Sequence, residues 1–321
     1  MIVTVTLNPL LERRYSFHTV NYPGNNRDGI LNLKAGGKGI NVSRQLNQLN
    51  TPNLAFTFLG GSNGKLFRNL LKDEDINFTS VNKRSETRDG VVIVDEQNEK
   101  VTSLFGMNPD ITEEEVNEFK EKLEKIIQNC EIVIFSGSSP CKTTDSITPF
   151  GIETANRFDK ISVCDTYGNH LSDCIKAGPT VLHNNVDEIK KSLNQTLDSE
   201  ESIISFLDQL YSNRIKQSYI TNEGKVFYAS NFDFHFKIIP PCLKAISSTG
   251  SGDSFTAGIV YGWHKDLTFE ESLKLGTSLG AANAARFDVS NVTRKDCEEL
   301  IPRVDIQTVG KKMKILDVTP R

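Results

Sequence analysis

The sequence predicts a three-layer α/β/α fold with a central, mostly parallel sheet and a small β-sheet lid. Short β-rich runs alternate with amphipathic segments, which is typical of a parallel sheet covered by helices on both faces. The strand candidates are short apolar runs at residues 2–7, 54–59, 131–136, 161–165, 180–183 and 218–221. Two further segments, residues 11–34 and about 86–109, are β-rich without an intervening helix and break this alternation.

Two of the amphipathic segments carry clear helix signals. Residues 39–49 repeat apolar side chains at helical spacing, and residues 113–128 follow Thr112, with Glu115 three positions later. A threonine followed by a glutamate at that spacing is a capping box, which is typical of a helix start. We therefore expect a helix over each of these two segments.

The two β-rich segments predict a small sheet lying over one edge of the core. Residues 90–94 and 101–104 form a hairpin pattern around the polar stretch 95–100. A lid is a natural use for such an appendage, because chemistry on charged groups benefits from the exclusion of water. No linker rich in Gly, Ser and Pro divides the chain, so residues 1–321 are expected to form a single domain with the lid inserted.

Composition excludes several classes of function. The 321 residues are 37% hydrophobic and 24% charged with a formal net charge of −4, and no basic stripe indicates a nucleic-acid partner. No apolar run approaches the ~18 residues that a membrane span needs. The six cysteines form no CxxC pair and the five histidines form no HxH or HExxH cluster, so a zinc site is not expected. We expect a cytoplasmic protein with free thiols.

The strongest chemical signal is the run Ser-Thr-Gly-Ser-Gly-Asp-Ser-Phe-Thr-Ala-Gly at residues 248–258. Gly250 and Gly252 allow a tight turn, and the helical spacing that follows leaves N–H groups and a helix dipole aimed at one point. Such a site suits a phosphate group. Asp253 could accept the proton of an attacking hydroxyl there. The alternative is that Asp253 only caps the helix.

A second glycine-rich stretch, residues 35–43, reads Ala-Gly-Gly-Lys-Gly-Ile-Asn-Val-Ser and precedes a predicted helix. It is not a P-loop, because the pattern GxxxxGK[ST] is absent. The backbone around Gly37, together with Lys38 and Asn41, could hold a polar substrate. The alternative is a loop that only packs a helix tightly on the sheet. No GxGxxG follows the first strand, so a dinucleotide-binding enzyme is set aside.

Taken together and in this order, the motifs resemble those of the PfkB family of carbohydrate kinases. The nearest branch is that of 1-phosphofructokinases and tagatose-6-phosphate kinases, and the resemblance covers nearly the whole chain. The matching segments are Thr6 to Tyr15, Gly36 to Arg44, Thr87-Arg88, Ser136-Gly-Ser138, Asp165-Thr-Tyr-Gly168, Asn185-Val-Asp-Glu188 and Gly250 to Asp253. The resemblance implies a ribokinase-like fold and an ATP-dependent kinase.

The resemblance also assigns roles by position. Asp253 matches the catalytic base, and the turn of Gly250, Ser251 and Gly252, with its backbone amides, would receive the γ-phosphate. The matching substrate-binding positions are Glu12, Arg27, Gly37, Lys38, Asn41, Arg88, Ser138 and Asp253. Of these, Arg27, Arg88 and Ser138 match positions that hold the phosphate of a phosphosugar, which a planar guanidinium suits.

ATP and Mg²⁺ are the implied cofactors. The matching nucleotide-binding positions are Asn185, Thr221, Gly224, Gly250, Gly252 and Asn283. Asn185 and Glu188 match the family's NxxE motif, which organises Mg²⁺, usually through water, in agreement with its preference for oxygen ligands. The plain alternatives are a helix-face carboxylate for Glu188 and a surface turn for Arg88. The resemblance also allows a homodimer through the lid.

Several positions depart from the family pattern. Glu12 replaces the sugar-binding Asp of the opening motif, residues 183–185 (His-Asn-Asn) replace KPN, and residues 104–109 replace the lid motif LNEPGP. The residues for phosphoryl transfer match, while those that select the substrate differ.

We therefore expect ATP-dependent phosphorylation of a phosphorylated ketose, tagatose 6-phosphate or fructose 1-phosphate, to a sugar bisphosphate. One alternative is a kinase of a neutral sugar or a nucleoside on the same fold. The other is a non-catalytic protein that senses nucleotide or sugar phosphate.

Overall fold

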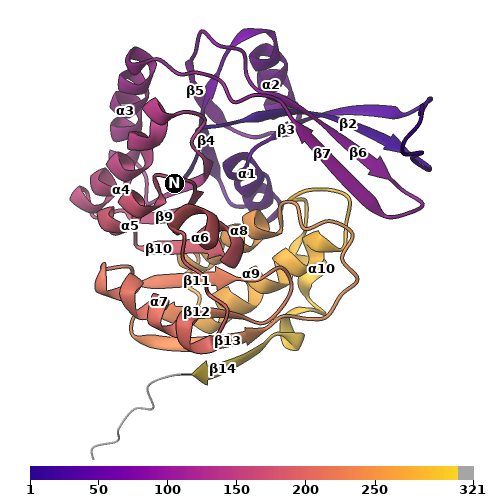
Figure 1. The fold of residues 1–321 in the computed structure, drawn as a ribbon. Coiled ribbons are helices and arrows are strands. Elements are labelled where there is room, and N and C mark those ends of the chain that lie inside the picture. The colour runs from indigo at the N-terminus through magenta and orange to yellow at the C-terminus, as the bar shows by residue number, and fades with distance from the viewer. Residues whose placement is uncertain (310–321) are drawn as a thin grey trace, which may run out of the picture.

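A ten-stranded sheet forms the centre of the molecule in the computed structural model, which describes residues 1–309 (Figure 1). From one edge to the other its strands are β14 (Asp305–Val309), β13 (Phe234–Ile239), β12 (Phe227–Asn231), β11 (Gln217–Thr221), β10 (Val181–Asn185), β9 (Ile161–Tyr167), β8 (Ile132–Ser138), β1 (Ile2–Thr6), β4 (Asn53–Leu59) and β5 (Phe78–Asn82). Pairing is parallel from β11 to β5 and antiparallel from β11 to β14. The predicted mostly parallel sheet is confirmed, and each predicted strand overlaps one of these.

Helices cover both faces of this sheet, as predicted. One face carries α1 (Lys38–Gln48), α2 (Gly61–Asp73), α8 (Ser251–His264), α9 (Phe269–Ala284) and the short α10 (Arg294–Cys297). The other face carries α3 (Glu113–Gln128), α4 (Ile147–Arg157), α5 (Leu171–Ala177), α6 (Val186–Leu193) and α7 (Glu200–Ser212). Short 3-10 helices lie at Lys142–Ser146 and Ile301–Arg303.

The side chains of the central strand β1 explain why the sheet needs helices on both faces. Val3 and Val5 point into the core formed with α3 to α7, while Ile2 points into the core formed with α1 and α8. On the same face as Ile2, the hydroxyl groups of Thr4 and Ser43 are hydrogen-bonded at 2.6 Å, which ties β1 to α1. A central parallel strand is buried on both faces and is therefore apolar almost throughout.

A four-stranded small sheet stands beside this core and projects from it (Figure 1). In spatial order its strands are β3 (Ile30–Gly36), β2 (Leu10–Phe17), β6 (Asp89–Asp95) and β7 (Lys100–Phe105). These strands lie in or beside the two β-rich segments of the sequence, and β6 and β7 form the predicted antiparallel hairpin. Because β2 follows β1 closely and β3 leads into α1, the small sheet is joined to the core at one end.

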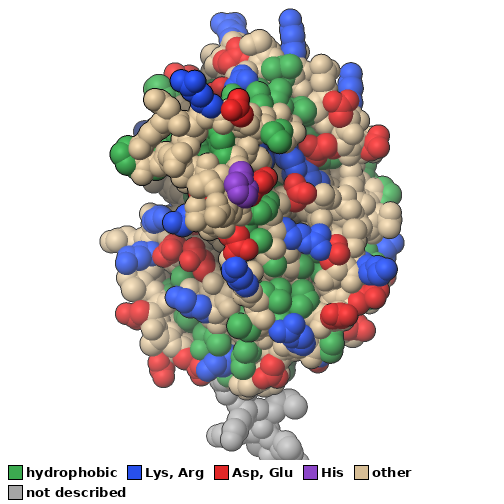
Figure 2. Space-filling model, turned by 90° about the vertical axis from the view of Figure 1, so that its right-hand side faces the viewer, with side chains coloured by type: hydrophobic (Ala, Val, Ile, Leu, Met, Phe, Trp, Pro, Cys, Tyr) green, Lys and Arg blue, Asp and Glu red, His purple; other side chains and the backbone are tan. Residues whose placement is uncertain are grey.

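The surface carries mixed charge on the side from which the small sheet projects. Figure 2 shows acidic and basic side chains interspersed over this face. Among the described residues, no helix has both the length and the apolar character needed to cross a lipid bilayer.

The capping box predicted at the start of α3 is confirmed. The Glu115 N–H donates to Thr112 Oγ1 at 3.3 Å, and the Thr112 N–H donates to Glu115 Oε2 at 2.9 Å. Two amides that would lack helical partners are thereby satisfied. The helix then turns Phe119 into the core, where its ring lies 4.0 Å from that of Phe56 and 4.3 Å from that of Phe58.

We expect Phe119→Ala to lower the free energy of unfolding by about 3–5 kcal/mol, because it removes a fully buried ring and leaves a cavity against β4. Urea denaturation followed by circular dichroism measures this change. Asn117→Ala, at an exposed position of the same helix, is the control and should change stability by less than about 0.5 kcal/mol. Equal losses in the two variants would contradict this account of the core.

Candidate active site

A cavity of about 880 Å³ opens at the carboxyl ends of the parallel strands and reaches the base of the small sheet. Open α/β sheets bind their ligands at this edge, where the strands end and the following loops and helices begin. Most of the residues predicted for the site line it, namely Glu12, Gly37, Lys38, Asn41, Arg88, Ser138, Asn185, Glu188, Thr221, Gly224, Gly250, Ser251, Gly252 and Asp253.

The glycine-rich turn before α8 forms one wall of this cavity. Gly250 has φ +79°, and a side chain there would meet Val289 at 2.4 Å, so only glycine fits. The helical ladder begins with the hydrogen bond from the Ser254 N–H to the Gly250 carbonyl at 2.9 Å, so the first-turn amides precede it. The Ser251 amide already donates to Ser248 O at 3.1 Å. The amides of Gly252 and Asp253 therefore remain as the donors that face the cavity from this turn.

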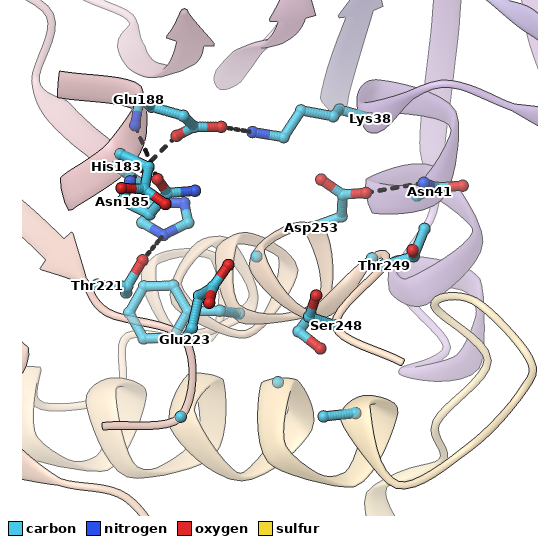
Figure 3. Close-up of a pocket in the computed structure, with 18 of the residues that line it drawn as sticks. Lys38, Asn41, His183, Asn185, Glu188, Thr221, Glu223, Ser248, Thr249 and Asp253 are labelled. Atoms are coloured by element: carbon cyan, nitrogen blue, oxygen red, sulfur yellow. Dashed lines mark hydrogen bonds and ion pairs between the residues drawn. The ribbon is translucent and has the colours of Figure 1, made fainter. Parts of the chain in front are cut away.

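Asp253 lies in the first turn of α8 and does not cap the helix. The N-cap residue is Gly250, and no side chain caps this end. The Asp253 carboxylate instead accepts a hydrogen bond from Asn41 Nδ2 at 2.7 Å, across the cavity from α1 (Figure 3). The capping alternative is thus not what the structure has, and the carboxylate is directed into the cavity.

Burial sets the protonation of this carboxyl group. Asp253 is 3% exposed, and burial raises the pKa of its carboxyl to about 7 against the opposing positive charge of Lys38. The nearby carboxylates of Asp165 and Glu188 raise this pKa further, and the Asn41 hydrogen bond lowers it. A carboxylate with a pKa near neutrality is suited to take up a proton during a reaction.

Lys38 lies between two carboxylates at the centre of the site. Its Nζ is 3.0 Å from Asp165 Oδ1 and 3.0 Å from Glu188 Oε1 (Figure 3 draws the second contact). Burial alone would lower the pKa of Lys38, but the charges of Asp165, Glu188 and Asp253 raise it well above its ordinary value. Lys38 is therefore a permanent cation that joins α1 to β9 and α6.

Asp165 lies directly behind the cavity wall in contact with Lys38, and no role was assigned to it from the sequence. It is fully buried near the end of β9, where Ser136 Oγ donates to it at 2.6 Å and His183 Nδ1 lies 3.3 Å away. Burial would raise the pKa of Asp165, but Lys38 and His183 outweigh it and hold this pKa below its ordinary value. The available signal was an aspartate at the end of a predicted strand, since strand ends of a parallel sheet meet at the ligand-binding edge.

Asn185 and Glu188 form the capping box of α6. The Glu188 N–H donates to Asn185 Oδ1 at 2.8 Å, and the Asn185 N–H donates to Glu188 Oε2 at 3.0 Å. The second oxygen of Glu188 is the one that contacts Lys38. The NxxE pattern thus caps the start of α6. Within residues 1–309 no group of three or more His, Cys, Asp or Glu side chains is arranged to hold a metal directly.

Arg88 stands at the other end of the cavity, in a polar corner. Its Nη1 donates to Asn108 Oδ1 at 3.0 Å, and Asn8 Nδ2 donates to the same oxygen at 3.0 Å and to Ser138 Oγ at 3.4 Å. The guanidinium also lies 5.6 Å from the centre of the Phe105 ring. Asn8 and Asn108 were not singled out from the sequence. Asn8 follows the end of β1, which is a usable signal, whereas nothing in the spacing around Asn108 indicates its contact with Arg88.

Two of the predicted site residues lie outside the cavity lining. Arg27 is exposed in the connection between β2 and β3. Asn283 on α9 is buried behind the glycine-rich turn, where it donates to Thr249 O at 2.8 Å and to Ser251 Oγ at 3.1 Å. Asn283 thus supports the turn from behind, and its predicted contact with the nucleotide stays a prediction, as does the role of Arg27.

Glu12 lines the cavity but is held close to the small sheet. It is 9% exposed, and its carboxylate lies 4.0 Å from Arg14 Nη1. Burial raises the pKa of Glu12, opposed by the charges of Arg14, Arg44 and Lys34. A carboxyl group of this kind can accept a hydrogen bond from a hydroxyl group of a ligand.

Comparison with known proteins identifies the family of this chain. The model for pfkB family carbohydrate kinases matches residues 6–296. The chain belongs to this family. It is accordingly an ATP-dependent carbohydrate kinase, so the family and enzyme class expected from the sequence are confirmed.

Two curated relatives span almost the same length as this kinase. The 1-phosphofructokinase of Borreliella burgdorferi is 28% identical over 317 residues, covering 96% of this chain and 99% of the relative. The tagatose-6-phosphate kinase of Staphylococcus epidermidis strain ATCC 12228 is 27% identical over 310 residues, covering 95% and 99%.

Solved structures share the fold of this kinase. A 1-phosphofructokinase candidate from Thermotoga maritima superposes with a TM-score of 0.88 at 24% identity, covering 96% of this chain and 99% of that one. Phosphofructokinase-2 from Escherichia coli superposes with a TM-score of 0.85 at 21% identity, covering 94% and 98%. The ribokinase-like fold class expected from the sequence is thereby confirmed.

The raised pKa of Asp253 predicts an acidic limb in the pH profile of the kinase. Below a pH of about 7 the carboxyl group is increasingly protonated, and the catalytic base predicted at this position would then be unable to take up a proton. We expect kcat/KM to fall by about tenfold per pH unit on that side. Asp253→Asn should lower kcat by roughly 10²–10⁴-fold while ATP binding by calorimetry changes little. A wild-type profile that is flat between pH 5 and pH 8 would contradict this role.

Proposed function

We propose that this kinase transfers the γ-phosphate of ATP to a ketose that already carries a phosphate group, giving a sugar bisphosphate. Tagatose 6-phosphate and fructose 1-phosphate are the proposed substrates. The observation that carries this proposal is the state of Arg88 in the cavity wall, at the end away from the glycine-rich turn.

Arg88 is a half-buried cation without an acidic partner in residues 1–309. Its hydrogen-bond partner there is the neutral Asn108, and its buried Nε has no partner among the described residues. Burial lowers the pKa of Arg88, but an arginine does not give up its proton, so the uncompensated charge favours an anionic ligand. A phosphate group matches the donor pattern of the guanidinium, and Ser138 and Asn8 lie beside it to add hydrogen bonds.

The names of the relatives support the same substrate class. The Borreliella burgdorferi protein is a 1-phosphofructokinase and the Staphylococcus epidermidis protein is a tagatose-6-phosphate kinase, and both names describe enzymes that act on sugar phosphates. At 27–28% identity the two names differ in the sugar, and both sugars therefore stay in the proposal.

In the proposed reaction, Asp253 takes up the proton of the sugar hydroxyl that attacks the γ-phosphate. The Gly252 and Asp253 amides at the start of α8 stabilise the charge on the transferred phosphoryl group, together with the positive end of the helix dipole. Lys38 adds a fixed positive charge, and Gly37 and Asn41 help to hold the sugar. Phosphoryl transfer needs little covalent help, so positioning, charge and the exclusion of water account for the rate.

Mg²⁺ is the second proposed cofactor, bound with the phosphates of ATP. A donor that lines the cavity is the carboxylate of Glu188, and carboxylate oxygen is the ligand chemistry that Mg²⁺ prefers. Both oxygens of Glu188 already contact protein groups, Lys38 through Oε1 and the Asn185 N–H through Oε2, so the fit is to an ion that keeps most of its water shell, with Asn185 orienting Glu188. When bound, Mg²⁺ supplies positive charge to the nucleotide phosphates.

We also propose that the small sheet acts as the lid of this single-domain kinase and pairs with a second copy of the chain. Its outer strands β3 and β7 are sheet edges, and they expose Ile30 (67%), Leu104 (58%) and Phe105 (61%). Free edges with exposed apolar side chains favour association.

Light scattering tests this pairing. The wild type is expected to be a dimer in solution, and Leu104→Glu on β7 should shift it towards the monomer by placing charge in the contact. Leu66→Glu, on the exposed face of α2, is the control that should leave the dimer intact. A monomeric wild type at micromolar concentration would rule the pairing out.

A coupled ADP-release screen over phosphorylated ketoses, neutral sugars and nucleosides tests the proposed reaction. Turnover with tagatose 6-phosphate or fructose 1-phosphate and no turnover with the neutral compounds is the expected result. Turnover with a neutral sugar or nucleoside alone would show a kinase of different specificity, and binding of ATP without turnover on the whole panel would indicate a sensor.

Arg88→Ala should raise KM for the sugar phosphate by about 30- to 100-fold, because a charge-assisted contact to phosphate is lost. KM for ATP should stay within about twofold, since the nucleotide binds at the other end of the cavity. Arg84→Ala is the matched control, because Arg84 is an exposed arginine of the same segment paired with Glu114. Unchanged sugar-phosphate KM in Arg88→Ala would end the assignment of a phosphate to this corner.

A further inference from the structure

A chain of hydrogen bonds leads from Asp253 away from the cavity and ends on α2. Asn41 Nδ2 donates to Asp253 Oδ2 at 2.7 Å, and Arg44 Nη1 donates to Asn41 Oδ1 at 2.9 Å. Arg44 Nε in turn donates to Glu74 Oε2 at 2.6 Å. Asn41 and Arg44 are three residues apart on α1, so they lie on one face of the helix and can meet.

The chemistry at the two ends of the Asn41 side chain allows one orientation of its amide. A guanidinium can only donate hydrogen bonds, and an ionised carboxylate can only accept them. The amide oxygen must therefore face Arg44, and the amide nitrogen must face Asp253. In the reversed orientation both contacts would be repulsive, so Arg44 fixes which group Asp253 meets.

Arg44 is itself held in place on both sides. Its side chain is buried, its Nη2 donates to the carbonyl of Ala35 on β3, and its Nε pairs with Glu74 at the end of α2. The guanidinium therefore has three acceptors from three different elements: the Asn41 amide of α1, the Ala35 carbonyl of β3 and the Glu74 carboxylate. A planar guanidinium that donates to three fixed acceptors is held in one orientation.

We propose that Arg44 is a positioning residue for the catalytic base, acting by locking the Asn41 amide so that an N–H always faces Asp253. The proposal rests on the role of Asp253 in the proposed function. Arg44 touches neither Asp253 nor the cavity, and its effect passes through Asn41. The second N–H of Asn41 stays free to reach a substrate, so the lock and the predicted substrate contact are compatible.

Removal of Arg44 has a defined electrostatic consequence. Without the guanidinium the amide of Asn41 can turn, and its oxygen then faces the carboxylate of Asp253. Loss of a hydrogen bond to the ionised form raises the pKa of a carboxyl group, and a facing oxygen raises it further. The other charged groups that face Asp253 are Lys38 from α1, Asp165 from β9 and Glu188 from α6, and Arg44→Met leaves all three in place.

The test measures the pKa of Asp253 directly, by ¹³C NMR of aspartate carboxyl groups, in the wild type and four single variants. We expect Arg44→Met to raise this pKa by about one unit, Arg44→Lys by less because one donor is kept, and Glu74→Gln least. Arg68→Met is the matched control, because Arg68 makes comparable contacts to Gly64, Ser80 and Asn82 and does not reach Asn41. It should leave the pKa of Asp253 unchanged.

A double variant separates positioning from simple stabilisation. In an Asn41→Ala background the lock has nothing to act on, so adding Arg44→Met should not shift the pKa of Asp253 any further. If the two changes shift it additively, Arg44 acts by some route other than Asn41 and the proposal is wrong. If Arg44→Met does not fold, Arg44→Lys and Glu74→Gln provide the same comparison, because both keep a polar group at the substituted position. An Asp253 pKa equal to that of the wild type in both variants would overturn the proposal.

The kinetic readout distinguishes failure of this proposal from failure of the proposed function. In an active enzyme, the acidic limb of kcat/KM should move to higher pH in Arg44→Met by the same amount as the NMR titration. An active wild type with an unmoved Asp253 pKa in the variants refutes the lock and leaves the kinase reaction standing. A wild type without turnover on sugar phosphates refutes the proposed function, and a shifted Asp253 pKa in Arg44→Met would still support the lock.

Discussion

The contacts of Lys38 with Asp165 and Glu188 hold the site together. One ammonium group meets two carboxylates at 3.0 Å each, and a third carboxylate, that of Asp253, lies within its field. A buried carboxylate is costly unless it is paired, and here a single cation compensates a cluster of three acids. Asp165, which Lys38 contacts directly, has a pKa held below its ordinary value, whereas Asp253 has no such contact and burial raises its pKa to about 7. The opposite pKa shifts of Asp165 and Asp253 thus depend on where the ammonium group of Lys38 lies.

The topology of the sheet explains why these groups meet. In the strand order, β1 lies between β8 and β4. Later strands are therefore added on both sides of β1: β4 and β5 on one side, and β8 to β11 on the other. The carboxyl ends of β8, β9, β10 and β11 lie along one edge of the sheet. Asp165 comes from β9, Glu188 from the helix after β10, and Lys38 from the helix that returns from the small sheet. Open α/β sheets form a crevice at this reversal of strand order. Because β3 leads directly into α1, Lys38 lies beside the small sheet, and one segment of the chain carries both an edge strand of that sheet and the central cation of the site.

His183 shows how a departure from the family pattern is accommodated. A lysine at this position would place a second ammonium group next to Asp165, whereas the imidazole fills the space between β10, β11 and α8. Its Nδ1 lies 2.9 Å from Thr256 Oγ1, and its Nε2 lies 3.1 Å from Thr221 Oγ1. The ring also packs close to Gly252, where an added side chain would meet it at 3.3 Å. His183 therefore fills the space beside the turn and joins β10 to β11 and α8 through its two ring nitrogens.

Sequence reasoning found the groups whose chemistry has a local signature and missed those that act through distant contacts. The glycines of the turn at residues 250–252 and the capping box of Thr112 were predicted because backbone conformation and hydrogen bonding between near neighbours leave a pattern in adjacent positions. Arg44 was passed over although it lies within the matched motif and only three residues from its partner Asn41, because its other partners are Glu74, 30 residues away, and a backbone carbonyl, which no residue type reveals. Asn108 was missed for the same reason. Its partner Arg88 directly precedes β6, whereas Asn108 follows β7, so the two side chains meet only when β6 and β7 pair. Polar contacts between elements depend on register and side-chain direction, and these are fixed by the packed fold and cannot be deduced from spacing along one chain.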